Sequence, residues 1–147
     1  MLMTGWYPCI PGWHLDDIPR TRKDGQPDHR SPIYKADHVM GIVGEVSKTE
    51  FVFGKLRLYD VPEGKGTIYE IWNKEIDLLL KRGRIKIRAV EPGRVIYFDH
   101  ECFHRGTPTT RPGWRWFIRI TRNSQRKFLN EVRTQTQVYL TAPFDGW

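Results

Sequence analysis

Residues 93–121 have the sequence GRVIYFDHECFHRGTPTTRPGWRWFIRIT, around which we expect the rest of the chain to be organised. Their first part is apolar, a loop with His100 and His104 follows, and a Pro-Gly turn leads into a second apolar run that contains Arg115 and Arg119. Short apolar runs bounded by Gly and Pro are typical of β-strands. We therefore expect two strands joined as a hairpin, with histidines beside the end of the first strand and arginines along the second.

Other parts of the chain also favour β-structure. The pattern predicts further strands at Ile33–Val46, Phe51–Tyr59, Thr67–Ile71, 84–90, Arg94–Phe98 and 128–141. In 84–90 apolar and basic residues alternate, so Ile85, Ile87 and Ala89 are expected to share one half-buried face.

One helix is expected among these strands. Asn73 suits its N-cap position, and Gly83 suits the position after its last turn. Between them, Ile76, Leu79 and Leu80 fall at helical spacing. Many short strands, frequent Gly and Pro turns and a single helix predict an all-β fold, a sandwich or barrel of jelly-roll type.

Length and composition bound the class of protein. A chain of 147 residues is long enough for one domain with a real core, so we expect a single domain over 1–147. No apolar run approaches the ~20 residues of a membrane helix, and the first residues lack the features of a signal peptide. We expect a cytoplasmic protein in which Cys9 and Cys102 are reduced and buried.

The positive charge of the chain is concentrated in one stretch. Residues 105–133 hold seven arginines and one lysine against a single acid, Glu131, which accounts for the net charge of +7. Such a patch suggests an anionic partner, either a nucleic acid, a phosphorylated metabolite or a dicarboxylate. A solvated, arginine-rich sheet edge explains the same pattern without any partner.

A candidate metal site begins at His14 and Asp16. Residues two apart on a strand face the same way, about 6.5–7 Å apart at Cα, so these two side chains can bind one ion from one side. Asp17 is then excluded by parity. A third ligand from a distant strand would complete a face of two histidines and one carboxylate, which is the arrangement of non-haem Fe(II) oxygenases.

Two histidines compete for the third position. His100 and His104 each have an arginine eleven residues later, Arg111 and Arg115, so the spacing does not decide between them. Arg111 lies in a Pro-Gly turn, whereas Arg115 lies in an apolar strand that fixes its direction. We therefore choose His104 together with Arg115.

The chain resembles the Fe(II)- and 2-oxoglutarate-dependent dioxygenases. The resemblance rests on His14-Leu15-Asp16, on the segment 92–98 that leads to His104, and on Gly113-Trp114-Arg115 about ten residues later. It implies a double-stranded β-helix, which is a cupin-like jelly-roll barrel. Members of this family usually have further elements before the His-x-Asp strand, so the barrel implied here is minimal or truncated at its N-terminus.

The resemblance also implies roles for individual residues. His14, Asp16 and His104 would hold Fe(II), and Arg115 would bind the distal carboxylate of 2-oxoglutarate, with Arg119 in reserve. A planar guanidinium suits a carboxylate because it can bind both oxygens and does not lose its proton. The implied reaction consumes 2-oxoglutarate and O2 and hydroxylates a further substrate.

Two alternative functions stay open at this point. One is a non-catalytic jelly-roll module that binds nucleic acid through the basic region 105–133, with an affinity that falls steeply with salt. The other is a cupin-like iron or zinc enzyme that needs no 2-oxoglutarate.

Two local alternatives are equally open. Arg115 and Arg119 could form the solvent face of their strand, with Trp114, Trp116, Ile118 and Ile120 buried. The polar segment 17–32 follows directly on the candidate ligands, and it would be either a lid over the substrate or a plain mobile loop.

Overall fold

The computed structural model describes residues 1–124 except 10, 34, 55 and 59. Its elements are β1 (Asp37–Val43), β2 (Thr49–Phe53), α1 (Ile68–Lys81), β3 (Lys86–Val90), β4 (Val95–Asp99), β5 (His104–Gly106) and β6 (Trp116–Arg122). The expectation of a mainly β fold with one helix is confirmed for this part of the chain. The strand predicted at 128–141 lies outside the described residues.

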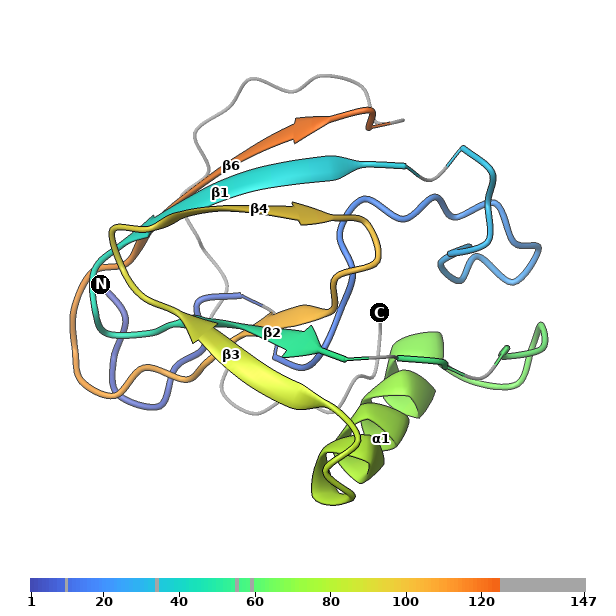
Figure 1. Cartoon of the computed structure of the whole chain (residues 1–147), viewed down its shortest axis with the longest axis horizontal. Coiled ribbons are helices and arrows are strands. Elements are labelled where there is room, and N and C mark those ends of the chain that lie inside the picture. The colour runs from blue at the N-terminus through green and yellow to red at the C-terminus, as the bar shows by residue number, and fades with distance from the viewer. Residues whose placement is uncertain (10, 34, 55, 59, 125–147) are drawn as a thin grey trace.

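The strands form two antiparallel sheets of three strands each. One has the order β4-β1-β6 and the other the order β3-β2-β5. Figure 1 shows the two sheets one above the other, with α1 beneath the second sheet. The predicted hairpin over 93–121 is wrong, because β1 lies between β4 and β6 and the chain between them contributes β5 to the other sheet.

An apolar core fills the space between the two sheets. It consists of Met40, Ile42, Phe51, Val90 and Phe98, all buried. Alternation along β1 explains its contribution, since every second side chain of this strand faces the opposite sheet. His38 is on the same inner face and is completely buried.

A second core lies between α1 and the sheet β3-β2-β5. It gathers side chains of the helix, of the N-terminal segment and of the strand ends, namely Trp13, Leu15, Ile18, Val61, Ile68, Tyr69, Trp72, Ile76, Ile85 and Phe103. The molecule therefore has three layers, sheet, sheet and helix. The N-terminal segment is fixed in the layer next to the helix.

The helix begins earlier than the sequence predicts. It starts at Ile68 with Thr67 as N-cap, so the strand expected at Thr67–Ile71 is wrong. Thr67 makes no capping hydrogen bond with its side chain. Instead, the amide oxygen of Gln26 accepts a hydrogen bond of 3.3 Å from the Ile68 N–H, a partner that sequence spacing does not indicate. The predicted end is confirmed, since the helix stops before Gly83, whose φ is +66°.

Three strands are shorter than expected, and the face of β3 that is expected to be buried is buried only in part. The strands predicted at Ile33–Val46, Phe51–Tyr59 and 84–90 correspond to β1, β2 and β3. Ile85 is 3% exposed, but Ile87 is 37% exposed, which corrects the expectation that both are half-buried on one face. β3 is the edge strand of its sheet, and the apolar cluster under α1 includes Ile85 but not Ile87.

The outer face of the sheet β4-β1-β6 is apolar and exposed. It carries Val39, Val43, Val95, Tyr97, Trp116, Ile118 and Ile120, each between 37% and 75% exposed. The alternative in which the apolar side chains of β6 are buried and its arginines face solvent is therefore wrong. No helix among the described residues is long and apolar enough to cross a membrane.

Candidate metal centre

Backbone pairing brings His14 next to His104. The His14 N–H donates to the His104 carbonyl at 3.0 Å, and the His104 N–H donates to the His14 carbonyl at 3.1 Å. This bridge joins the N-terminal segment to β5, and it places the centroids of the two imidazole rings 4.6 Å apart. The expected extended conformation around His14 is thus present as a single β-bridge.

The helix holds the backbone on both sides of His14. The buried side chain of Asn73 accepts a hydrogen bond from the Trp13 N–H at 2.6 Å and donates to the Trp13 carbonyl at 2.8 Å. The Tyr69 hydroxyl donates to the Leu15 carbonyl at 3.1 Å. Sequence reasoning assigned Asn73 to a helix cap and missed both contacts, because neither partner is near in sequence.

Both histidine rings are oriented for metal binding through Nε2. The His14 Nδ1–H donates to the Gly12 carbonyl at 2.9 Å, and the His104 Nδ1–H donates to the Cys102 carbonyl at 2.9 Å. A histidine that binds a metal commonly donates its other ring N–H in this way, which fixes the tautomer and the direction of the ring. The two rings meet this condition through carbonyl groups two residues before them.

His14, Asp16 and His104 form one group, and their potential ligand atoms all lie within 4.8 Å of one another. The His104 Nε2 and the Asp16 Oδ2 are 3.0 Å apart. Ligands at ~2.0–2.2 Å from one ion are separated by about 3 Å when their directions are perpendicular. The three residues therefore fit a divalent metal ion after a small closing movement.

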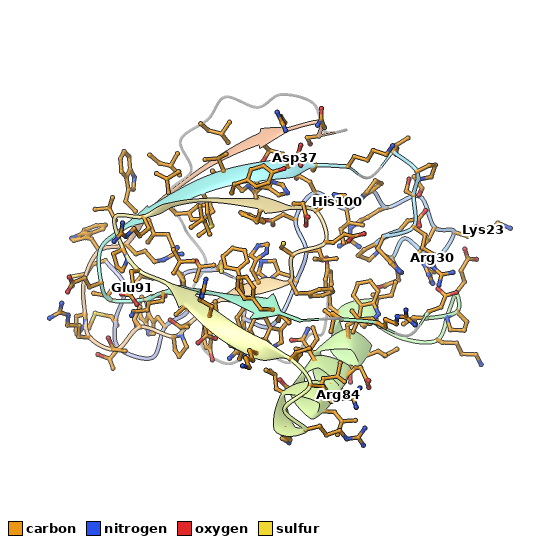
Figure 2. The ribbon with its side chains drawn as sticks, in the orientation of Figure 1. Lys23, Arg30, Asp37, Arg84, Glu91 and His100 are labelled. Carbon is orange, nitrogen blue, oxygen red and sulfur yellow. The ribbon has the colours of Figure 1, made fainter. Side chains whose placement is uncertain are left out.

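His100 is not part of this group. It lies in the turn directly after β4, where Figure 2 labels it, whereas His104 opens β5. Asp17 is also absent from the group, and its φ of +57° marks a turn of the backbone directly after Asp16.

The protonation states of two of these side chains suit a cation. Burial, followed by the neighbouring His104, lowers the pKa of His14 to about 4, so the ring is neutral at pH 7. Burial would raise the pKa of Asp16, but the hydrogen bond and charge of His104 and the charge of Arg119 outweigh it. The pKa of Asp16 is therefore held well below its usual value, and the carboxylate is ionised.

Arg119 reaches the same carboxylate from β6. Its Nη1 contacts the Asp16 Oδ2, the oxygen that also faces the His104 Nε2. The side chain is 27% exposed, and it comes from the inner face of the sheet, opposite Met40 of β1. Arg119 is thus in contact with the candidate ligand Asp16 and only partly exposed to solvent.

Arg115 is also directed inward, and it has no acidic partner among the described residues. Its Nη2 donates to the Thr49 hydroxyl at 2.7 Å, while its Nε is buried without a hydrogen-bond partner. Burial lowers the pKa of this guanidinium. A buried cation without a carboxylate nearby favours the binding of an anion.

The other arginines of the described basic stretch are ion-paired. Arg105 binds Glu50 at 2.8 Å, and Arg122 binds Asp37 at 2.9 Å. Arg111 lies 3.2 Å from Glu45. The stretch 105–124 therefore does not present a row of unpaired cations, and the basic residues beyond it lie outside the described part.

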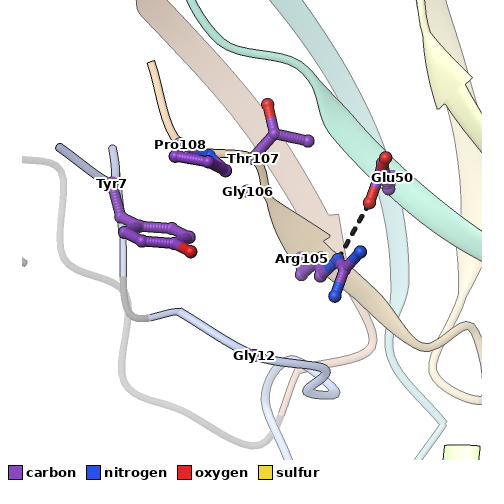
Figure 3. Close-up of a pocket in the computed structure, with 7 residues that line it drawn as sticks. All are labelled: Tyr7, Gly12, Glu50, Arg105, Gly106, Thr107 and Pro108. Carbon is purple, nitrogen blue, oxygen red and sulfur yellow. Dashed lines mark hydrogen bonds and ion pairs between the residues drawn. The ribbon is translucent and has the colours of Figure 1, made fainter. Parts of the chain in front are cut away.

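A polar pocket of about 210 Å³ lies on the other side of β5. Figure 3 shows its lining, which consists of Tyr7, Gly12, Glu50, Arg105, Gly106, Thr107 and Pro108. None of the three candidate ligands lines it. The pocket is nevertheless adjacent to the site through Gly12, whose carbonyl orients His14.

The segment 17–32 is tied to the chain before α1. The Asp24 carboxylate accepts hydrogen bonds from the Arg22 guanidinium and from the Gly64 N–H, and Arg22 also donates to the Val61 carbonyl at 2.9 Å. These contacts give the segment a defined position beside the helix layer. Whether it covers a substrate stays a prediction.

Comparisons with models of protein families, with curated proteins and with solved structures find no match to this chain.

Proposed function

We propose that the protein is a non-haem Fe(II) dioxygenase that uses 2-oxoglutarate as cosubstrate and hydroxylates a further substrate. The observation that carries this proposal is the convergence of His14, Asp16 and His104, with both rings oriented through backbone carbonyls. Two imidazoles and one carboxylate are the donor set that leaves positions on iron open for other ligands.

Arg115 supports the 2-oxoglutarate part of the proposal. Its Nη2 donates to Thr49 of β2, its Nε is buried without a hydrogen-bond partner, and no described carboxylate pairs with it. A dicarboxylate that binds iron through its keto-acid end has a second carboxylate to place. A guanidinium in this environment would bind that second group.

The residues of the chain would bind and orient, while the bound iron and cosubstrate supply the oxidative chemistry. His14 presents a neutral Nε2 atom, His104 presents a second imidazole Nε2, and Asp16 supplies one negative charge. Asn73 and Tyr69 keep the backbone around His14 in place from the helix side. The two facing sheets belong to a double-stranded β-helix in this proposal, with the site at the inner end of β5.

The test is the binding of Fe(II) and 2-oxoglutarate without oxygen. We expect the full chain to produce the weak visible absorption of an Fe(II)–2-oxoglutarate complex. His104→Ala should abolish the absorption because it removes one ligand, and Arg115→Ala should raise the 2-oxoglutarate concentration needed for half-saturation. His100→Ala is the matched control and should leave the absorption unchanged.

Two results would contradict the proposal. Correctly folded, iron-loaded protein that gives no such absorption would exclude a 2-oxoglutarate enzyme. Retention of the absorption in His104→Ala, with its loss in His100→Ala, would exclude the assigned ligand set.

A further inference from the structure

We propose that Arg119 couples metal binding to cosubstrate binding, because in the metal-free protein its guanidinium pairs with a carboxylate that the metal needs. This inference rests on the proposed function. It predicts that the metal binds weakly alone and that a dianionic cosubstrate strengthens its binding by more than chelation explains.

The competition is visible in the contacts of Asp16. Its Oδ2 faces both the His104 Nε2, at 3.0 Å, and the Arg119 Nη1. Asp16 and Arg119 are 19% and 27% exposed, so water screens this pair only in part. A divalent ion at the ligand group would take Oδ2 from Arg119 and would be repelled by its charge.

The balance of charge shows what would relieve this repulsion. With a divalent ion bound, Asp16 would be the carboxylate of the ligand group that faces both the ion and the cation of Arg119, and Arg115 adds a partly buried cation with which no described carboxylate pairs. A dicarboxylate brings two negative charges to this group. Once displaced from Asp16, Arg119 is free to pair with one of them, so each ligand favours the binding of the other by the same factor.

The experiment measures the affinity for Mn(II) or Co(II) by calorimetry, with and without saturating 2-oxoglutarate. Arg119→Gln removes the competing charge and keeps a polar side chain. We expect this variant to bind the metal alone about tenfold more tightly than the wild type. We also expect 2-oxoglutarate to improve its metal affinity by a smaller factor. Because a chelating dicarboxylate adds coupling of its own, the comparison between the two proteins is decisive.

Two controls keep the result interpretable. Arg122→Gln removes an exposed arginine of the same strand, paired with Asp37, and should leave both affinities unchanged. Arg119→Met retains the aliphatic stem, and it repeats the test if thermal melting shows that the Gln variant is misfolded. It should strengthen metal binding in the same way.

Failure of this inference differs from failure of the proposed function. If the wild type binds neither metal, the proposed function is wrong. If the wild type binds metal and the Arg119 variants bind it equally or more weakly, the coupling role is wrong while the metal site stands.

A second, independent observation concerns the outer face of the sheet β4-β1-β6, and from it we infer that a second copy of this chain packs there. Its cross-strand rows are Tyr97–Val39–Ile120, Val95–Gly41–Ile118 and Val43–Trp116. None of these eight positions carries a charge. Its two aromatic side chains, Tyr97 and Trp116, are 62% and 65% exposed.

The size of this face approaches what a stable dimer needs. An exposed aromatic side chain contributes roughly 150–250 Å², and the seven exposed side chains together present on the order of 700 Å². Apolar patches on monomers are about 300–600 Å² at most, while each partner in a stable interface buries about 800 Å². Gly41, in the middle row of the face, carries no side chain, and a Cβ built there would lie 4.0 Å from a methyl group of Val95.

The test is the mass of the full chain in solution at rising concentration, by light scattering or sedimentation. We expect a dimer that strengthens with salt, because two copies with a charge of +7 repel each other. Trp116→Lys or Ile120→Lys should give a monomer, while Ile87→Lys, on an exposed position of the other sheet, should stay dimeric.

A monomer at all concentrations would overturn this inference, as would a dimer that survives both lysine substitutions. Shielding of Trp116 from a fluorescence quencher in such a monomer would assign the cover of this face to another part of the chain.

Discussion

Asn73→Ala is the substitution that tests most directly how the helix holds the candidate metal site. The amide of Asn73 makes three buried hydrogen bonds: one from the Trp13 N–H at 2.6 Å, one to the Trp13 carbonyl at 2.8 Å and one to the Tyr69 carbonyl at 2.8 Å. Trp13 is 1% exposed, so water cannot replace the lost partners without opening the core. The residue after Trp13 is the first candidate ligand, His14.

The magnitude follows from the groups left unpaired. Alanine leaves the N–H and the carbonyl of Trp13 buried without these partners, and each such group costs about 1–3 kcal/mol. The better helix propensity of alanine returns about 0.5 kcal/mol. We therefore expect a loss of about 2–4 kcal/mol in the free energy of unfolding, a large fraction of the 5–15 kcal/mol typical of a domain.

Urea denaturation, monitored by tryptophan fluorescence and circular dichroism, measures this loss. The two proteins can be compared directly if the free energy of unfolding falls with urea concentration at the same slope in both. Lys74→Ala is the matched control, since the Lys74 side chain is 75% exposed and pairs with Glu70 one turn away. It should cost about 0.5 kcal/mol or less. A loss below 1 kcal/mol in Asn73→Ala, or one equal to the control, would refute the view that this side chain fixes the segment before His14. In the same variant, Co(II) affinity should fall while His100→Ala leaves it intact.

Three further predictions test the fold and its titratable groups. Gly44→Ala should lower the free energy of unfolding by about 2–4 kcal/mol, since φ is +102° and a Cβ would clash with the Trp114 carbonyl oxygen. Gly64→Ala, where φ is +71° and the space is open, should lower it by about 1 kcal/mol. Equal losses for the two variants in urea denaturation would contradict this. Burial lowers the pKa of His38 below 6.5, so the unfolded chain takes up a proton that the folded chain does not, and stability should fall as the pH drops below about 6.5. His38→Gln should flatten this fall in thermal melts, and an unchanged pH dependence would contradict the assignment. Partial burial, followed by the hydrogen bond to Asp99, raises the pKa of Cys102 to about 11, so iodoacetamide should modify it slowly at pH 8. A rate equal to that of free cysteine, measured by mass spectrometry, would contradict the raised pKa.

The sequence predicts the local elements better than their pairing. Strand positions follow from alternation, and the helix end follows from Gly83, because both depend on neighbours in the chain. The hairpin over 93–121 could not be excluded in this way, since the placement of β1 between β4 and β6 is a property of distant segments. The helix start likewise depends on Gln26, which comes from a loop more than forty residues earlier.

The residues of the candidate site also differ in whether the local sequence indicates them. His14, Asp16 and His104 can be proposed from spacing, because histidines and a carboxylate in that order have a chemical meaning. The supporting residues Asn73 and Thr49 cannot be proposed in this way, since an asparagine in a helix and a threonine at a strand end are common without such a role. An asparagine on the apolar side of a helical pattern is the one indication the sequence offers for Asn73, because a buried amide needs partners.

The orientation of β6 is the part of the structure that local preference argues against. Alternation defines two faces of this strand, and stability alone would favour burying Trp116, Ile118 and Ile120 while leaving the arginines in water. The structure has the reverse arrangement, and each residue of β1 pairs with one of β6 in a register that fixes it. A one-residue slip would exchange the two faces and remove Arg119 from Asp16. Departures from local preference concentrate at functional sites, so the inward arginines and the exposed apolar face are two consequences of one choice of register, the first serving the proposed metal site and the second the proposed dimer.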